Sequence, residues 1–272
     1  MRPLAARPGY PSRIVCLTEE TTEILYRIGA GDLVVGVSGY TVRPQEARKK
    51  PKVSAFISAN YDKVMALSPD VVLAFSDLQA DITRELIKRG VSVFTFNQRS
   101  VEEILTTIRV VGSIVGYHDE AERLAEDMIR NLAETKDRAA RLRHRPRVYF
   151  EEWDDPMISG IRWVAELIEI AGGEDIFPEL RDQSIASGRI VAADEIIRRD
   201  PQIILASWCG KKVRPEKIAS RPGFDQIAAI RSNRIHEIKS AIILQPGPAA
   251  LTDGLAALQS FIFTDLPTPP SA

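Results

Sequence analysis

Short apolar segments alternate with amphipathic segments along most of this chain. Four apolar runs in the first hundred residues have the length of buried strands, namely 13–17, 33–38, 70–75 and 91–96. None of them alternates apolar with polar residues, which is typical of strands that are covered on both faces. Strands that alternate with helices indicate βα units and a parallel sheet. The first part of the chain is therefore predicted to form a parallel α/β lobe.

The same pattern predicts the helices and the remaining strands. Helices are expected after Thr18 and at 60–68, 77–89, 101–116, 119–143, 161–171, 194–199 and 249–262, and strands at 147–153, 201–208 and 234–239. The segment 41–54 is polar and contains Pro44 and Pro51, so it is predicted to be a loop.

The predicted helix 119–143 is the longest element, and it contains neither Gly nor Pro. Acidic residues gather at its start and basic residues at its end, an arrangement that the helix dipole favours. A helix of this length would span about 37 Å, which is about the diameter of a small domain. The pattern therefore predicts a rigid connector between two lobes.

A short internal similarity indicates that the two lobes are alike. Residues 63–75 and 195–208 both read as a helix, a proline and an apolar strand that ends at an aromatic residue. The predicted fold class is α/β, with two Rossmann-like lobes of parallel strands joined by one long rigid helix. The expected division is an N-terminal lobe at 1–118, the interlobe helix at 119–145, a C-terminal lobe at 146–264 and a disordered tail at 265–272.

Composition and charge exclude several classes of protein. The 272 residues carry a formal net charge of −1 and are 44% hydrophobic, which excludes a mostly disordered chain and argues against a nucleic-acid-binding protein. Two cysteines cannot build a disulfide framework, and the three histidines have no metal-ligand spacing. No apolar run is long enough to span a membrane, and residues 1–13 lack the apolar core of a signal peptide. The sequence as it stands predicts a cytoplasmic protein, or a periplasmic one if its start is trimmed or misassigned.

In parallel α/β sheets, ligands bind beyond the carboxyl ends of the strands. Two lobes whose strand ends face each other would form a cleft, and clefts between domains are common ligand sites. The residues predicted to bind a ligand there are Thr18, Glu19, Glu20, Tyr40, Phe75, Ser76 and Asn97 from the first lobe and Trp153 and Trp208 from the second. Flat aromatic side chains with scattered hydrogen-bonding groups suit a large, partly apolar ligand.

Signals for catalysis are weaker than those for binding. The phosphate-binding patterns GxxxxGK[ST] and GxGxxG and the hydrolase pattern GxSxG do not occur in the sequence, so no catalytic residue and no catalytic cofactor is predicted. The acidic cluster at 151–155 has two interpretations, a metal or acid–base site or a solvated rim of the cleft. The basic residues Lys211, Lys212 and Arg214 are interpreted as plain surface.

Three motifs of the first lobe resemble the N-terminal lobe of the cobalamin-binding proteins of ABC importers. They are Thr22-Glu23-Ile24-Leu25, Val35-Gly36-Val37-Ser38-Gly39-Tyr40 and Leu67-Ser68-Pro69-Asp70-Val71-Val72-Leu73. In the second lobe, Ala171-Gly172-Gly173-Glu174-Asp175-Ile176-Phe177 is similar to a signature of the same family. The wider helical-backbone group of substrate-binding proteins also includes binders of ferric siderophores and haem. The resemblance covers residues 13–262.

The resemblance implies a non-catalytic protein that binds cobalamin or a related corrinoid between its lobes. Tyr40 and Phe75 match family positions whose aromatic side chains pack against the corrinoid. One alternative is a ferric siderophore or haem as the ligand, for which Arg99, Arg162 and Arg189 are candidate contacts. The other alternative is a cytoplasmic corrinoid-handling factor or enzyme on the same scaffold.

The resemblance also implies an ABC permease as a partner, and it assigns a docking acid to Asp81. The segment 242–248 is largely aliphatic where the family carries a tryptophan and a second docking acid, which weakens the expected docking. We expect a monomer with no nucleic-acid partner and no membrane span.

Overall fold

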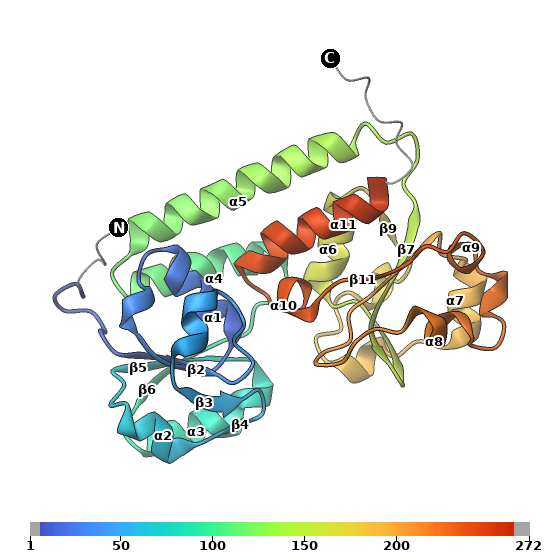
Figure 1. Ribbon diagram of the computed structural model, residues 1–272. Coiled ribbons are helices and arrows are strands. Elements are labelled where there is room, and N and C mark those ends of the chain that lie inside the picture. Colours follow the sequence, from blue (N-terminus) through green and yellow to red (C-terminus); the bar gives the residue numbers. More distant parts are fainter. Residues whose placement is uncertain (1–5, 264–272) are drawn as a thin grey trace. The chain divides into compact units, whose positions relative to one another are not determined.

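A computed structural model of the chain describes residues 6–263 (Figure 1). The tail predicted at 265–272 lies outside the described residues. The chain divides into two compact units. Unit 1 contains residues 6–98, 102–129 and 245–248, and unit 2 contains residues 99–101, 130–244 and 249–263.

Unit 1 is built on a six-stranded sheet in the order β4-β3-β2-β1-β5-β6. Its strands are β1 (Ile14–Cys16), β2 (Val34–Ser38), β3 (Lys52–Ala55), β4 (Ser58–Ala59), β5 (Val71–Phe75) and β6 (Ser92–Phe96). Every neighbouring pair is parallel except β3 and β4. All residues of the central strands β1 and β5 are buried, as expected for strands that are covered on both faces.

The helices of unit 1 are α1 (Glu19–Arg27), α2 (Tyr61–Ala66), α3 (Ala80–Lys88) and most of α4 (Val101–Ile114). Asn60 begins α2, because its side-chain oxygen accepts a hydrogen bond from the Lys63 backbone N–H at 3.0 Å. Apolar side chains from strands and helices form a core in which Leu17, Val72 and Leu86 have no exposed surface. This packing holds the carboxyl ends of β1, β2, β5 and β6 at one edge of the sheet.

Unit 2 has a smaller sheet in the order β11-β10-β7-β8, and β9 also pairs with β7. Its strands are β7 (Arg147–Asp154), β8 (Met157–Ser159), β9 (Glu174–Asp175), β10 (Ile203–Ala206) and β11 (Ile235–Glu237). Only the β7–β8 pair is antiparallel among the strand pairs described in this unit. Its helices are α6 (Arg162–Ile170), α7 (Ala193–Arg199), α8 (Pro215–Ala219), α9 (Ala228–Arg231), α10 (Ser240–Ile243) and α11 (Leu255–Ile262). The aromatic residues Tyr149, Phe177, Trp208 and Phe224 fill much of its core.

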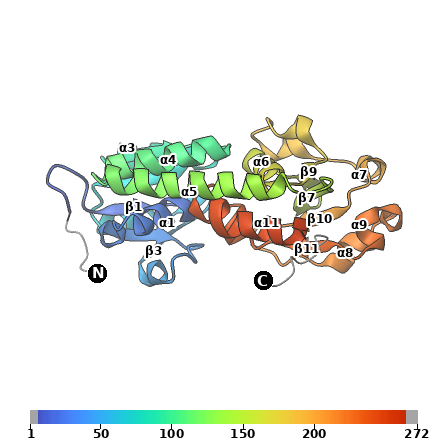
Figure 2. The ribbon, with the colours of Figure 1, turned by 90° about the horizontal axis from the view of Figure 1, so that it is seen from above.

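The longest helix is α5 (His118–Ala139), which Figure 2 shows as one unbroken helix. It begins one residue before the predicted start and ends before the predicted 143. The boundary between the units falls inside it, after Ile129. None of the helices within residues 6–263 is long and apolar enough to cross a membrane.

The predicted fold class is confirmed, because both sheets are mostly parallel and helices connect their strands. The prediction of a loop at 41–54 is wrong: a short 3₁₀ helix at Gln45–Lys49 leads into β3. The polar residues Lys52 and Ser54 conceal this strand in the sequence, and its pairing with β2 defines it instead. The predicted helix 249–262 begins with a π-helical segment, Ala250–Gly254, which continues into α11.

The internal similarity seen in the sequence corresponds to the same local structure in both units. The segment from α2 to β5 and the segment from α7 to β10 each contain a helix, a proline and a buried strand. Ser68 and Asp200, which directly precede Pro69 and Pro201, both have positive φ angles, of 45° and 43°. Few non-glycine residues adopt this conformation, so its recurrence is specific.

An arginine at the start of the neighbouring strand stabilises each of these turns. The Nε–H of Arg13 donates to the carbonyl oxygens of Leu67 and Ser68, and that of Arg147 donates to those of Arg199 and Asp200. The residue after each proline closes the arrangement, because the side chains of Asp70 and Gln202 accept the backbone N–H of Arg13 and Arg147. The two units therefore repeat one hydrogen-bonding device that joins a turn to a central strand.

These arginines make a testable contribution to stability. Arg13→Gln and Arg147→Gln should each lower the free energy of unfolding by about 1 kcal/mol, because each removes charge-assisted hydrogen bonds, from an exposed position at Arg13 and a half-buried one at Arg147. Arg198→Gln, which removes a solvent-exposed ion pair of α7, is the control and should cost less than half as much. Urea denaturation measures all three. Equal losses for the three variants would contradict a special role for the two turn arginines.

Candidate functional site

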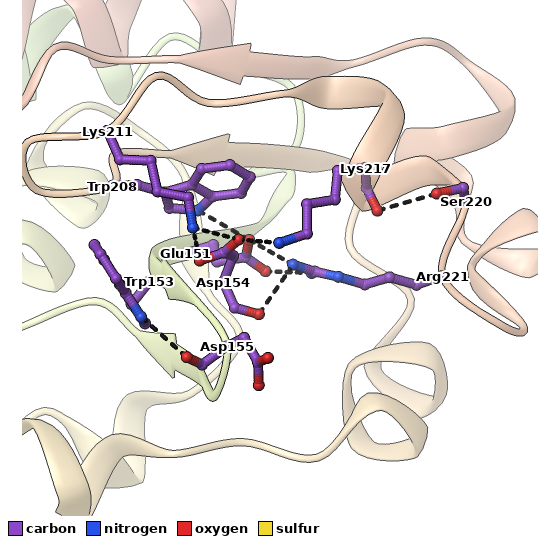
Figure 3. A network of polar contacts seen from close by, with 9 residues as sticks. All are labelled: Glu151, Trp153, Asp154, Asp155, Trp208, Lys211, Lys217, Ser220 and Arg221. Carbon is purple, nitrogen blue, oxygen red and sulfur yellow. Dashed lines mark hydrogen bonds and ion pairs between the residues drawn. The ribbon is translucent and has the colours of Figure 1, made fainter.

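A dense cluster of polar side chains in unit 2 lies at the carboxyl ends of β7 and β10 (Figure 3). The two strands are parallel neighbours, with Glu151 in register with Ala206. Trp153, Asp154 and Trp208 follow these paired positions and therefore come to the same edge of the sheet. This is the edge at which parallel α/β sheets bind ligands.

The side chain of Glu151 has no exposed surface. Its carboxylate accepts two hydrogen bonds from the Arg221 guanidinium, one of them 2.9 Å long between Nη2 and Oε1. It also accepts the indole N–H of Trp208 at 3.1 Å and the hydroxyl of Tyr149 at 3.3 Å. A buried carboxylate is stable only when its charge and its lone pairs are compensated, and these four hydrogen bonds meet both needs. The network consequently fixes the position of the Trp208 ring.

Asp154 ends β7, and its side chain is also fully buried. Its two oxygens accept hydrogen bonds from the Lys211 ammonium at 2.6 and 2.8 Å, and Lys217 donates to Oδ2. Burial alone would raise the pKa of Asp154, but the hydrogen bonds and charges of the two lysines lower this pKa to about 2. Asp154 is therefore ionised at neutral pH and holds both lysines at the strand ends.

The two lysines lie against indole rings. The Lys211 Nζ is 4.8 Å from the centre of the Trp153 ring and 5.0 Å from that of Trp208, and the Lys217 Nζ is 5.8 Å from the centre of the Trp208 ring. Cations at such distances are attracted to the electron-rich faces of the rings. Trp153 is half-buried, and its indole N–H donates to the Asp155 carbonyl oxygen at 3.0 Å. The structure thus brings together the two tryptophans predicted to bind a ligand, but Trp208 is 2% exposed and belongs largely to the core, so only Trp153 offers a ring to a ligand.

A pocket of about 390 Å³ opens beside this network. It is lined by Trp208, Lys211, Lys212, Arg214 and Lys217. The interpretation of the Lys211–Arg214 segment as plain surface is wrong for Lys211, because this lysine pairs with a buried carboxylate. Four cationic side chains around one aromatic wall give this pocket a positive potential.

The predicted residues Thr18, Glu19 and Glu20 of unit 1 lie at the start of α1. Glu20 is 1% exposed, and its Oε1 accepts the hydroxyl of Thr18 at 2.5 Å. Its Oε2 is buried and has no hydrogen-bond partner within the described part of the chain. Burial raises the pKa of Glu20 to about 8. The negative charge of Glu19 also raises this pKa, whereas the hydrogen bond from Thr18 lowers it. Glu20 is therefore mostly protonated at neutral pH.

The other predicted residues of unit 1 follow β2, β5 and β6. Tyr40 is 56% exposed, whereas Phe75 and Ser76 are 5% and 2% exposed. Ser76 and Asn97 line a groove of about 640 Å³ that runs along α3. Tyr40 is therefore the predicted aromatic residue of this unit that offers most surface to a ligand, while Phe75 belongs largely to the core.

Asp81, the predicted docking acid, lies in the first turn of α3. Its side chain is 92% exposed and makes an ion pair with Arg84 at 3.1 Å. Among the arginines suggested for an anionic ligand, Arg162 pairs with Glu166 at 2.8 Å and the buried Arg189 pairs with Glu152 at 2.7 Å. Arg189 therefore does not present its guanidinium to solvent.

The interpretation of the acidic cluster at 151–155 as a solvated rim is wrong for Glu151 and Asp154, which are buried and ion-paired, whereas Asp155 is exposed. Within residues 6–263, no group of three or more His, Cys, Asp or Glu residues could hold a metal ion. Burial raises the pKa of the Cys16 thiol to about 12, so this cysteine is not a nucleophile at neutral pH.

Sequence reasoning missed Lys217 and Arg221, which complete the network. They follow the acidic cluster by more than sixty residues and belong to no motif. The nearest signal in the sequence was the basic pair Lys211-Lys212, which begins five residues after the end of β10.

The Glu151–Arg221 pair predicts a large loss of stability when one partner is removed. Glu151→Gln should lower the free energy of unfolding by about 3 kcal/mol, because it leaves the guanidinium of Arg221, which is 14% exposed, without a counter-charge. Asp155→Asn, which changes an exposed carboxylate nearby, is the matched control and should cost little. Chemical denaturation followed by tryptophan fluorescence checks both. A Glu151→Gln variant as stable as the control would contradict this account of the network.

Glu20 predicts a pH dependence of stability with a definite sign. The folded-state pKa of Glu20 lies above the unfolded value, so the folded state holds this proton more tightly, and stability should fall as the pH rises from about 4.5 to about 8. Glu20→Gln should remove part of this decline and raise Tm relative to the wild type at pH 8–9. Glu46→Gln, which replaces an exposed carboxylate of the same unit, is the control. Parallel profiles of Tm against pH for the wild type and Glu20→Gln would refute the prediction.

Known proteins agree with this architecture. Residues 14–242 match the family model described as periplasmic binding protein. The chain is 28% identical over 265 residues to an uncharacterised ABC transporter substrate-binding lipoprotein, YvrC, of Bacillus subtilis (strain 168). The alignment covers 94% of this chain and 81% of the lipoprotein. It is 27% identical over 205 residues to the vitamin B12-binding protein of Yersinia pestis (strain Pestoides F). That alignment covers 74% of this chain and 71% of the vitamin B12-binding protein.

A solved structure supports the same fold. The periplasmic heme-binding protein RhuT from Roseiflexus sp. RS-1 superimposes with a TM-score of 0.78 at 24% sequence identity, over 93% of this chain and 100% of that one. At this identity the likeness shows the fold and not the ligand.

The relatives contradict the prediction of a cytoplasmic protein. That prediction rested only on how the sequence begins, whereas the matched family is that of periplasmic binding proteins and the Bacillus subtilis relative is a lipoprotein. The resemblance to substrate-binding proteins, in contrast, is confirmed. The family model covers both parallel-sheet units, and the chain belongs to the periplasmic binding protein family.

Proposed function

We propose that this chain is the substrate-binding component of an ABC importer and that its solute is cobalamin or a related corrinoid. Substrate-binding relatives support the general role, and the vitamin B12-binding relative supports the ligand class. The observation that carries the proposal is the half-buried indole of Trp153, which is held at the strand ends of unit 2 by its own hydrogen bond and by Lys211. A corrinoid is a large ring compound with an apolar face that such a side chain can cover.

Aromatic side chains would supply most of the binding energy. Covering about 100 Å² of apolar surface with one ring contributes about 2.5 kcal/mol. Trp153 in unit 2 and the exposed Tyr40 in unit 1 each offer a ring for this purpose. The fixed position of Trp153 lowers the entropy cost of binding, because its side chain is already ordered. Among the remaining predicted contacts, the exposed Asn97 stays a proposal, whereas Thr18 has no exposed surface and donates its hydroxyl to Glu20. No catalytic role is proposed.

A second candidate is haem or a ferric siderophore. The observation that favours it is the pocket lined by Lys211, Lys212, Arg214 and Lys217, since such compounds often carry negatively charged groups. This pocket lies beside Trp208, so a ring ligand near the tryptophans could place an acidic group among the cations.

Delivery to a permease would require accessible acidic groups. Asp81 meets this condition, because its side chain is 92% exposed and an ion pair as exposed as Asp81–Arg84 is easily exchanged. We propose Asp81 as a docking residue of unit 1. The segment 242–248 offers no second acid, so docking through unit 2 would need other residues.

Calorimetry with a panel of cyanocobalamin, haemin and a ferric siderophore tests the proposal. We expect cyanocobalamin to bind with a micromolar or lower Kd. The second candidate function expects haemin or the ferric siderophore to bind instead. Trp153→Ala should weaken binding about tenfold or more, because it removes a preformed ring contact. Phe94→Ala, which removes an exposed ring outside the predicted site, is the control and should bind as the wild type does. The absence of both heat and spectral change with all three compounds at micromolar concentrations would refute the proposed function.

A further inference from the structure

The cations around the pocket at the end of β10 are only partly neutralised. Asp154 supplies one carboxylate, which Lys211 and Lys217 share. Glu151 is occupied by Arg221. Within residues 6–263, neither the Lys212 ammonium nor the Arg214 guanidinium makes a hydrogen bond or an ion pair with another side chain, and both residues are exposed. The pocket therefore has more positive than negative charge, with two donors that remain available.

The fold holds these charges together at an energetic cost. Like charges that share one pocket repel each other, and the repulsion is relieved when an anion binds between them. Asp154 restricts Lys211 and Lys217, so these lysines cannot turn away from the pocket without breaking bonds of 2.6–2.8 Å or losing contact with a buried carboxylate. The short connection from Lys211 to Arg214 keeps the other two cations nearby. The result is a concentration of positive charge around the pocket that does not depend on a ligand.

The aromatic wall indicates what the anion is attached to. Trp208 lines the pocket, and Lys211 lies between its ring and that of Trp153, about 5 Å from each centre. Figure 3 shows the Lys211 ammonium near both indoles. Trp208 is 2% exposed and offers little surface, so the half-buried Trp153 supplies the ring that a solute can cover. A free inorganic anion would not use this ring, whereas an acidic substituent on a large ring compound would use both the ring and the cations.

We infer that this pocket binds an acidic substituent, a carboxylate or a phosphate, of the solute, with Lys212 and Arg214 as its direct contacts. The inference rests on the proposed function, because it assumes that the solute is a ring compound held at the tryptophans. Arg214 can hold two oxygens of such a group at once, and Lys212 adds a point charge. The pocket thus selects within the solute class, since it favours acidic members over amidated or esterified ones.

Two pairs of ring compounds test this selectivity. Haemin and its dimethyl ester differ in their carboxylates, and cyanocobalamin and dicyanocobinamide differ in the phosphate-linked nucleotide. In at least one pair, the acidic member should bind the wild type about tenfold or more tightly than its partner, and added salt should reduce the difference. A difference that depends on Lys212 and Arg214 identifies the group as a carboxylate in the haemin pair or as the phosphate in the corrinoid pair. Quenching of tryptophan fluorescence gives the Kd values.

The double variant Lys212→Gln/Arg214→Gln should remove this preference. Its affinity for the acidic member should fall about tenfold or more, while its affinity for the neutral member should hardly change. Lys136→Gln/Arg143→Gln removes the same charge from exposed positions of unit 2 and is the matched control. Circular dichroism and Tm establish that both double variants are folded.

The outcomes separate the two proposals. If a ring compound binds but acidic and neutral members bind equally well, or if the two double variants behave alike, the anion site is refuted and the proposed function stands. If no member of either pair binds the wild type, the proposed function fails and the anion site fails with it.

Discussion

A carboxylate without exposed surface, that of Glu151, lies near the end of the central strand of unit 2. Such a group must be compensated completely, and its partners come from three different parts of the chain: Tyr149 from the same strand, Trp208 from the end of β10 and Arg221 from the turn after α8. The need to satisfy one buried charge therefore joins segments that are far apart in sequence. It also decides where the Trp208 ring lies, and with it one wall of the cationic pocket.

A second buried carboxylate, Asp154, extends the same principle to the surface. It is ionised at neutral pH because the hydrogen bonds and charges of Lys211 and Lys217 lower its pKa. The carboxylate also keeps both lysines against the tryptophan rings. At the strand-end edge of unit 2, bases neutralise the buried carboxylates of Glu151 and Asp154. The exposed charges of Lys212 and Arg214 are not neutralised in this way. The buried charges stabilise the position of the aromatic side chains, whereas the exposed Lys212 and Arg214 line the pocket that we propose for an acidic group of the solute. Stability and binding use adjacent but different residues.

The long strands and helices could be predicted in order from the sequence, because most of these strands are continuous apolar runs, whereas the short elements β4, β8, β9, α8, α9 and α10 were missed. β3 was missed because Lys52 and Ser54 interrupt its pattern, and only pairing with β2 makes it a strand. The rule that ligands lie at strand ends selected Trp153 and Trp208 correctly as neighbours. It could not show that Glu151 and Asp154 are buried or which bases they pair with, because those bases follow 57 to 70 residues later. Pairing of this kind depends on tertiary structure and leaves no local trace.

The central claim is that the strand-end edge of unit 2 binds the solute through Trp153 and a neighbouring anion site. A crystal structure of the chain with the ring compound that binds most tightly tests it most directly. The account predicts the ring in van der Waals contact with the Trp153 indole and an acidic group within hydrogen-bond distance of Lys212 or Arg214. A ligand bound elsewhere, with Trp153 and both cations in contact only with solvent, would contradict it.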